Sequence, residues 1–162
     1  MVSVVNPAAS SAAALRRFQW RDFWAVYGLT RHAFGRDAFG MDMLFWRALL
    51  SGGGFWVSQQ GDEMVGYCLT RSSRWRGRGE VVAVAVRADA RGRGHGRRLM
   101  EETIAFMRTK RMRELRLEVA VTNTPAQALY RSLGFVLHEH LANYYGTGRH
   151  GWRMRLDLEP PQ

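Results

Sequence analysis

The sequence Arg91-Gly92-Arg93-Gly94-His95-Gly96 decides the fold because of the segments on either side of it. Residues 81–86 precede it as a continuous apolar run, which is typical of a strand buried on both faces. After it, apolar positions recur at helical spacing and predict an amphipathic helix of about four turns: Leu99, Met100, Thr103, Ile104 and Met107. A glycine-rich turn therefore joins the end of a central strand to the start of a helix.

Such a junction is a binding site for anions. The first backbone N–H groups of a helix have no partner and the helix dipole is positive there, so phosphate is a frequent ligand. Glycines let the backbone approach the phosphate. The flanking arginines add positive charge: Arg91, Arg93, Arg97 and Arg98. The stretch therefore predicts a phosphate-binding loop.

Two common phosphate motifs do not fit this loop. A Walker loop ends in Lys-Ser or Lys-Thr, whereas Arg97-Arg98 stands here. A dinucleotide fold needs Gly-x-Gly-x-x-Gly and further βαβ units, whereas these glycines stand at 92, 94 and 96 and only one further helix is expected. We expect a ligand that carries a pyrophosphate but is not held as NAD is.

A second motif lies in the C-terminal half. Apolar and polar residues alternate over residues 115–121, which predicts a strand with one apolar face. The chain then reads Asn123-x-x-Ala126-x-x-Leu129-Tyr130-x-x-x-Gly134-Phe135. Thr124 is the candidate N-cap and Pro125 fits the first helical position. We therefore expect a strand followed by a short helix.

Together the two motifs resemble the Gcn5-related N-acetyltransferase (GNAT) family. Its phosphate loop, Gln/Arg-x-x-Gly-x-Gly/Ala, matches Arg91-x-x-Gly94-x-Gly96, and its next helix matches the chain from Asn123 to Phe135. Leu117-Glu118-Val119, Tyr130 and Asn143-Tyr144-Tyr145 are similar to the RimI-type subgroup, which acetylates the N-terminal alanine of a ribosomal protein. The resemblance implies a layered α/β fold with a mixed, mostly antiparallel sheet of about six to seven strands and helices on both faces.

The pattern of the remaining chain predicts these elements: a strand over 15–18, helices over 20–34 and 41–50, a hairpin with strands over 54–58 and 64–70, a basic loop over 72–79, and a last strand over 152–158. We expect a single acetyltransferase domain over residues 15–158. A flexible tail over 1–14 and a short tail over 159–162 are expected at its ends.

The resemblance implies acetyl-CoA as the cosubstrate and no metal. The residues expected to bind it come from the central strand, the glycine loop and the second motif: Val84, Ala85, Val86, Arg91, Gly92, Arg93, Gly94, His95, Gly96, Arg97, Asn123, Ala126 and Tyr130. A backbone N–H of the central strand is expected to meet the oxyanion. Capping of the helix is the alternative role for Asn123.

The implied reaction is direct attack of a neutral primary amine on the thioester. The substrate ammonium must lose a proton first, and an α-amino group costs roughly 3 kcal/mol less to deprotonate than a lysine. Glu118 is the candidate base, directly or through a water, and Tyr130 is the candidate acid for the departing thiolate. An ion pair alone for Glu118 and core packing alone for Tyr130 stay open as alternatives.

The predicted acceptor is the N-terminal α-amino group of a protein, with a ribosomal protein as one candidate. The resemblance implies that Asn143, Tyr144 and Tyr145 hold the backbone of the acceptor peptide. Small-molecule amines and lysine side chains are the alternatives within the enzymes. The sequence leaves both a monomer and a homodimer open.

The charge of the chain is strongly positive. Its 24 basic residues stand against 14 acidic ones, for a net charge of +10, and Lys110 is the one lysine among them. A solvated basic surface is the default interpretation, but a basic patch also favours RNA or an acidic partner. The alternative outside the enzymes is therefore an RNA- or ribosome-associated binding module, which lacks the interleaved aromatic residues typical of RNA readers.

Localisation follows from two further features. Cys68 is the one cysteine, which excludes an internal disulfide and is typical of a reducing compartment. The sequence has neither an apolar run long enough to span a membrane nor a basic-then-apolar signal segment. We therefore expect a cytoplasmic protein without membrane contact.

Overall fold

The computed structural model describes residues 14–35 and 54–158, and between them only the single positions 40, 43, 46 and 52. Apart from isolated positions, the helix expected over 41–50 lies outside the described residues. The tails expected over 1–14 and 159–162 also lie outside them, except for Ala14, which begins the first strand.

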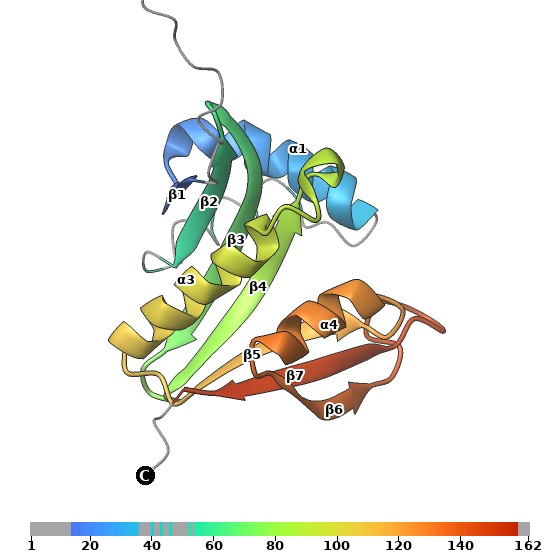
Figure 1. The fold of residues 1–162 in the computed structure, drawn as a ribbon. Coiled ribbons are helices and arrows are strands. Elements are labelled where there is room, and N and C mark those ends of the chain that lie inside the picture. The colour runs from blue at the N-terminus through green and yellow to red at the C-terminus, as the bar shows by residue number, and fades with distance from the viewer. Residues whose placement is uncertain are drawn as a thin grey trace, which may run out of the picture.

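The described elements follow in chain order: β1 (Ala14–Arg17), the 3-10 turn η1 (Trp20–Asp22), α1 (Phe23–Phe34), β2 (Phe55–Gln60), β3 (Glu63–Ser73), β4 (Arg78–Val86), η3 (Ala88–Ala90), α3 (His95–Thr109), β5 (Glu114–Ala120), α4 (Thr124–Ser132), β6 (Val136–Leu141) and β7 (Gly151–Asp157). The strands and helices expected in these parts of the chain are present, with ends shifted by a few residues. They form one sheet in the order β1-β2-β3-β4-β5-β7-β6 (Figure 1).

The sheet is antiparallel except at its centre. Every neighbouring pair of strands runs antiparallel apart from β4 and β5, which run parallel and are connected through α3. A parallel pair needs such a crossover connection, whereas antiparallel neighbours need only a turn. The expected mixed, mostly antiparallel sheet is confirmed.

Helices cover both faces because successive side chains of a strand point to opposite sides. On β3, Tyr67 and Leu69 pack with Val26 of α1, whereas Cys68 packs with Leu99 and Met100 of α3. The apolar face of α4 joins the same cluster as α3. Helices α3 and α4 therefore cover one face, and α1 covers part of the other (Figure 1).

The pairing between β4 and β5 stops halfway along the strands. It runs from Arg78 with Glu114 to Val81 with Leu117, although β4 continues to Val86 and β5 to Ala120. At the same level β3 pairs Thr70 with Val81 and Leu69 with Ala83, so that one residue of β4 is extra. Such a bulge increases local twist. Beyond it the two strands diverge (Figure 1).

Two local predictions differ from the structure. The loop expected over 72–79 is shorter: residues 74–77 form a turn, and β3 and β4 continue on either side as a hairpin in which Ser73 pairs with Arg78, because antiparallel pairing satisfies the backbone even where side chains are polar and exposed. Thr124 is not the N-cap of α4. Asn123 holds that position, and its side chain accepts a hydrogen bond from the N–H of Ala126 at 3.2 Å.

Candidate active site

The divergence of β4 and β5 leaves one edge of β4 without a neighbouring strand. The N–H of Arg87 donates to the carbonyl of Val65 on β3 at 2.7 Å. Backbone groups alternate between the two edges of a strand, so the N–H of Ala85 also faces β3, and those of Val84 and Val86 face the opened edge. Val84 and Val86 are therefore the residues of the expected group whose amides can donate to a ligand here.

The glycine loop continues from this edge into α3. Gly92 and Gly94 have φ angles of +74° and +84°, which glycine adopts without strain. A Cβ atom built on either residue meets no atom within 4 Å, so the space beside the loop is open. No side chain caps the start of α3, and its first N–H groups are available. The loop has the features of the expected phosphate site.

Three arginines surround the loop and use their guanidinium groups locally. Arg91 donates through Nε to the carbonyl of Val86 at 3.1 Å, and Arg93 donates to Gln60 at 3.2 Å. Arg97 donates to the hydroxyl of Ser132 on α4 at 2.7 Å. These bonds lie at the surface, where exchange for a charged phosphate is favourable.

His95 differs from the other residues of the loop because its side chain points inward. The ring is buried, and its Nδ1 atom lies 2.8 Å from the hydroxyl of Ser58 on β2. Burial, and then the charges of Arg98 and Arg93, lower the pKa of His95 below its usual value. The backbone of His95, and not its ring, is therefore the part that can meet a ligand.

The second motif contributes its residues unequally. A Cβ atom on Gly96 would lie 3.5 Å from the side chain of Leu129, so the middle of α4 packs on the start of α3. Asn123 lies about 9 Å further along the axis of α4, and its side chain caps that helix through Ala126. The structure brings Leu129 to the glycine loop, and it leaves Asn123 and Ala126 at the far end of α4.

Tyr130 is buried on the inner face of α4. Its ring packs against Phe135, with ring centroids 6.0 Å apart, and its hydroxyl has no hydrogen-bond partner among the described residues. Burial, followed by the proximity of Cys68 and Tyr145, raises the pKa of Tyr130 above its usual value. The phenol is neutral near pH 7 as any tyrosine is, and burial makes it a weaker acid.

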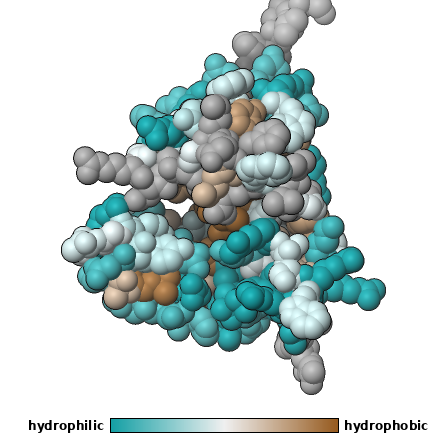
Figure 2. All heavy atoms as spheres, turned by 180° about the vertical axis from the view of Figure 1, so that it is seen from behind, coloured by the Kyte–Doolittle hydropathy of each residue, from teal (hydrophilic) through white to brown (hydrophobic). Residues whose placement is uncertain are grey.

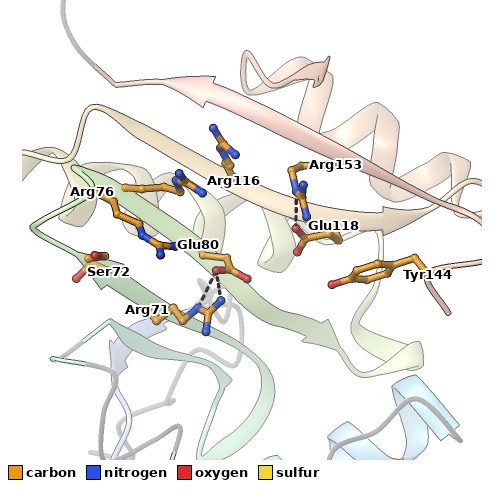
Figure 3. Close-up of a pocket in the computed structure, with 10 residues that line it drawn as sticks. Arg71, Ser72, Arg76, Glu80, Arg116, Glu118, Tyr144 and Arg153 are labelled. Carbon is orange, nitrogen blue, oxygen red and sulfur yellow. Dashed lines mark hydrogen bonds and ion pairs between the residues drawn. The ribbon is translucent and has the colours of Figure 1, made fainter. Parts of the chain in front are cut away.

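A polar pocket of about 470 Å³ opens on the sheet face opposite α3 and α4 (Figure 3). Its lining residues come from β3, β4, β5, β7, the turn between β3 and β4, and the loop between β6 and β7: Arg71, Ser72, Ser73, Arg76, Arg78, Glu80, Arg116, Glu118, Tyr144 and Arg153. From behind, this side of the molecule is largely hydrophilic, and a hollow with an apolar floor adjoins the lobe of β6 and β7 (Figure 2).

Glu118 lies in this pocket and forms an ion pair. Arg153 of β7 donates through Nε to one carboxylate oxygen of Glu118 at 2.9 Å, and also to Glu139 (Figure 3). The side chain of Glu118 is only 12% exposed. Its second oxygen, Oε2, has no partner among the described residues, so one oxygen is held and the other can accept a proton.

The three residues expected to hold a peptide have different places in the loop between β6 and β7. Tyr144 lines the pocket, and its pKa is raised by burial and then by the charges of Glu118 and Glu80. Asn143 has a φ of +53° and accepts the N–H of Gly148 at 2.8 Å, so its side chain supports the loop. Tyr145 packs edge-on against Tyr144, with ring centroids 4.9 Å apart.

The sequence did not identify Arg153 as the partner of Glu118. It also gave the arginines outside the glycine loop only as a solvated basic surface, whereas four of them converge in the pocket: Arg71, Arg76, Arg78 and Arg116. The available signal was the alternation of charged residues along β4, β5 and β7, which places them on one face. The order of the strands in the sheet is what shows that these residues lie in one pocket.

Cys68 is unsuited to carry an acyl group. It is fully buried, Thr103 donates a hydrogen bond to its sulfur, and burial raises its pKa to about 12. A thiolate is the nucleophilic form of cysteine. A route through an acylated Cys68 therefore does not compete with direct attack by the acceptor.

The described part of the chain contains neither a cluster of metal ligands nor a helix that could span a membrane. No three histidine, cysteine, aspartate or glutamate side chains converge there as a metal site would require. The rings of His140 and His150 lie 5.3 Å apart beside Trp152 without a third ligand. No helix among these residues has the length and apolar character to cross a bilayer.

Comparison with known proteins connects this geometry to a family. A family profile described as "Acetyltransferase (GNAT) family" matches residues 14–135. The ribosomal-protein-S18-alanine N-acetyltransferase from Escherichia coli superposes with a TM-score of 0.79 at 25% identity, covering 93% of this chain and 97% of its own. A sequence search of curated proteins gave no match.

Two further solved structures have the same fold. A chain of the NatC complex bound to Gag peptide and CoA has a TM-score of 0.85 at 19% identity, covering 91% of this chain and 99% of its own. The yncA protein from Salmonella typhimurium, solved with acetyl-CoA, has a TM-score of 0.79 at 23% identity, covering 94% and 97%.

Replacing Gly94 tests the phosphate loop. Gly94→Val adds a side chain beside the open backbone amides and strains a residue at φ +84°, so we expect the Kd for CoA to rise by at least about tenfold. Isothermal titration calorimetry measures it. Gly61→Val is the control, because Gly61 has a similar φ of +61° in the turn between β2 and β3. Equal affinities for both variants would exclude the loop as the phosphate site.

The burial of Cys68 predicts its reactivity. We expect a thiol reagent such as DTNB to label the native protein slowly and the protein in guanidinium chloride at once, because the thiol is buried and protonated at pH 8. Absorbance at the wavelength of the released product follows the reaction. Fast labelling of the folded protein would contradict the burial and reopen an acyl-cysteine route.

Proposed function

Because this chain belongs to the acetyltransferase (GNAT) family, we propose that it acetylates the N-terminal α-amino group of a protein. The family assignment makes it an acetyltransferase that uses acetyl-CoA. One observation carries the proposal for the acceptor: Tyr144, from the loop between β6 and β7, lines the same pocket as Glu118. That pocket adjoins the level at which β4 and β5 part.

The described residues fit acetyl-CoA, which supplies an activated acetyl thioester when bound. The open backbone of Gly92 and Gly94 and the uncapped start of α3 suit its phosphates. Arg91, Arg93 and Arg97 lie around that loop and add charge-assisted hydrogen bonds. The opened edge of β4 suits the thioester end.

Glu118 is the proposed base. Its free oxygen accepts a proton from the acceptor ammonium, directly or through a water, while Arg153 holds the other oxygen at 2.9 Å. The ion pair fixes the direction of the carboxylate and leaves one oxygen facing the pocket. Positioning of this kind is what general base catalysis requires.

Two further groups serve the charges that develop during transfer. The N–H groups of Val84 and Val86 face the opened edge of β4 and are the proposed donors to the oxyanion. Tyr130 is the proposed proton donor to the departing sulfur, because its phenol is protonated near pH 7 and its hydroxyl has no hydrogen-bond partner among the described residues. Its packing against Phe135 would hold the ring in one orientation.

Three considerations favour a protein N-terminus as the acceptor. An α-amino group costs roughly 3 kcal/mol less to deprotonate than a lysine, so the single carboxylate of Glu118 can remove its proton more readily. Tyr144 is half exposed and offers a flat surface and a hydroxyl to a peptide backbone. The similar Escherichia coli enzyme acts on the alanine of ribosomal protein S18, and the NatC structure contains a peptide. A ribosomal protein is therefore a candidate acceptor.

Removing the charge of Glu118 tests its role. We expect Glu118→Gln to lower kcat about 100-fold near pH 7 and to leave the Kd for CoA unchanged, because only proton removal is lost. Raising the pH should narrow the difference, since solvent then deprotonates the amine. Steady-state kinetics over a pH series measure both effects.

A matched control for this variant is available on β7. Asp157→Asn also converts a carboxylate to an amide in an ion pair with an arginine, Arg155, but outside the pocket. We expect wild-type kcat for it. A wild-type kcat for Glu118→Gln as well would remove Glu118 as the base and leave it as an ion-pair partner.

The acceptor class is tested with two peptides of one sequence. The first has a free N-terminal alanine and a blocked lysine, and the second has a blocked N-terminus and a free lysine. We expect mass spectrometry to detect at least about tenfold more acetylated product from the first peptide than from the second. Acetylation of the second alone would make the chain a lysine acetyltransferase, and acetylation of neither would favour a small-molecule amine.

A further inference from the structure

We propose that the pocket selects acceptors with a carboxylate about two to four residues beyond the reacting amine, bound at Arg76, Arg78 and Arg116. The inference rests on the proposed function in one respect, that the acceptor is a peptide. It concerns the part of the pocket that lies away from Glu118, along the paired half of β4 and β5.

The strand register fixes the distance between the two ends of this pocket. Arg116 precedes Glu118 by two residues on β5 and points to the same face, about 7 Å away. Arg78 of β4 pairs with Glu114, which is two residues further again. An extended peptide advances about 3.3 Å per residue along a sheet, so residues two to four positions beyond the one with the reacting amine span this distance.

The end of the pocket at Glu118 has a surplus of negative charge. Arg153 is the shared partner of Glu118 and Glu139, so one guanidinium faces two carboxylates. An ammonium group that enters beside Glu118 supplies the missing positive charge. This end is therefore suited to the amine of the acceptor.

The opposite end has a surplus of positive charge. Arg78 and Arg116 share one carboxylate, that of Glu114, each at 2.9 Å. Arg76, in the turn between β3 and β4, has no ion pair among the described residues and extends over the same pocket (Figure 3). A carboxylate placed here completes the pairing, because a guanidinium binds a carboxylate through two parallel hydrogen bonds.

Glu80 lies level with Arg116 on the neighbouring strand, and its charge is balanced by Arg71, which donates to it at 2.7 Å. The pocket is therefore acidic in balance at Glu118 and basic in balance at Arg76, Arg78 and Arg116. A peptide with a free amine and a nearby carboxylate is complementary to both ends. A polyanion such as RNA is less suited, because Glu80 and Glu118 line the pocket and repel successive phosphates.

A series of peptides measures this preference. The peptides begin with alanine and differ only at residues three and four, which are two aspartates, two asparagines or two arginines. We expect kcat/KM to be about tenfold higher for the aspartate peptide than for the asparagine peptide, and lowest for the arginine peptide. A second series presents the same neighbours beyond a free lysine with a blocked N-terminus.

Variants of Arg76 assign the preference to this pocket. Arg76→Gln should reduce the preference for aspartate about threefold, and Arg76→Glu should abolish or reverse it. Arg108→Gln is the matched control, because Arg108 is exposed near the end of α3 on the opposite side of the sheet. The preference of that variant should equal that of the wild type.

The two series separate this inference from the proposed function. A preference for aspartate in the lysine series alone would refute the α-amine acceptor and support the acidic selection. Equal kcat/KM for all neighbours, or a preference that survives Arg76→Glu, would overturn the inference. Binding of a single-stranded RNA that Arg76→Gln weakens, with no peptide preference, would also overturn it and assign the pocket to nucleic acid.

Discussion

The early end of the pairing between β4 and β5 is the constraint on which the site depends. Only the levels from Arg78 with Glu114 to Val81 with Leu117 are joined. A fully paired sheet would engage the N–H groups of Val84 and Val86 in a ladder with β5. The extra residue of β4 at the same level turns the strand away. One irregularity thus frees the edge of β4 that leads to the glycine loop, beside the pocket that contains Glu118.

In and around the pocket, single charged side chains are shared between two partners of opposite charge. In most surface ion pairs each charge has its own partner and the net contribution is small. Here Glu114 serves two arginines, and Arg153 serves two glutamates. The net charge of +10 therefore does not predict the charge at each place in the pocket, since one end is acidic in balance. The charge that a ligand meets there depends on which side chains pair with one another.

The sequence predicted the elements well and their lateral arrangement poorly. Apolar runs such as residues 81–86 and helical spacing around Leu99 report a local environment that each segment carries with it. The residue spacings of the glycine loop and of the stretch from Asn123 to Phe135 are also local, and they indicated the family. The pairing of Glu118 with Arg153 depends on β7 lying beside β5, and strand order is not a local property. For the same reason the polar hairpin at 72–79 resembled a loop, and the N-cap was misplaced by one residue where Asn123 and Thr124 are both good caps.

The short ladder also bears on how the two halves of the molecule hold together. In the described chain, residues 14–86 build β1 to β4 and residues 114–157 build β5 to β7, and β4 with β5 is the strand pair that joins these halves. Each half is continuous in sequence, and apart from this strand pair the two halves meet in the core cluster around α3. A ligand held at once by the edge of β4 and by α4 acts as a cross-link between them. By mass action its binding free energy is added to the cohesion of the sheet, and the apparent thermal stability of the protein becomes a measure of cosubstrate supply.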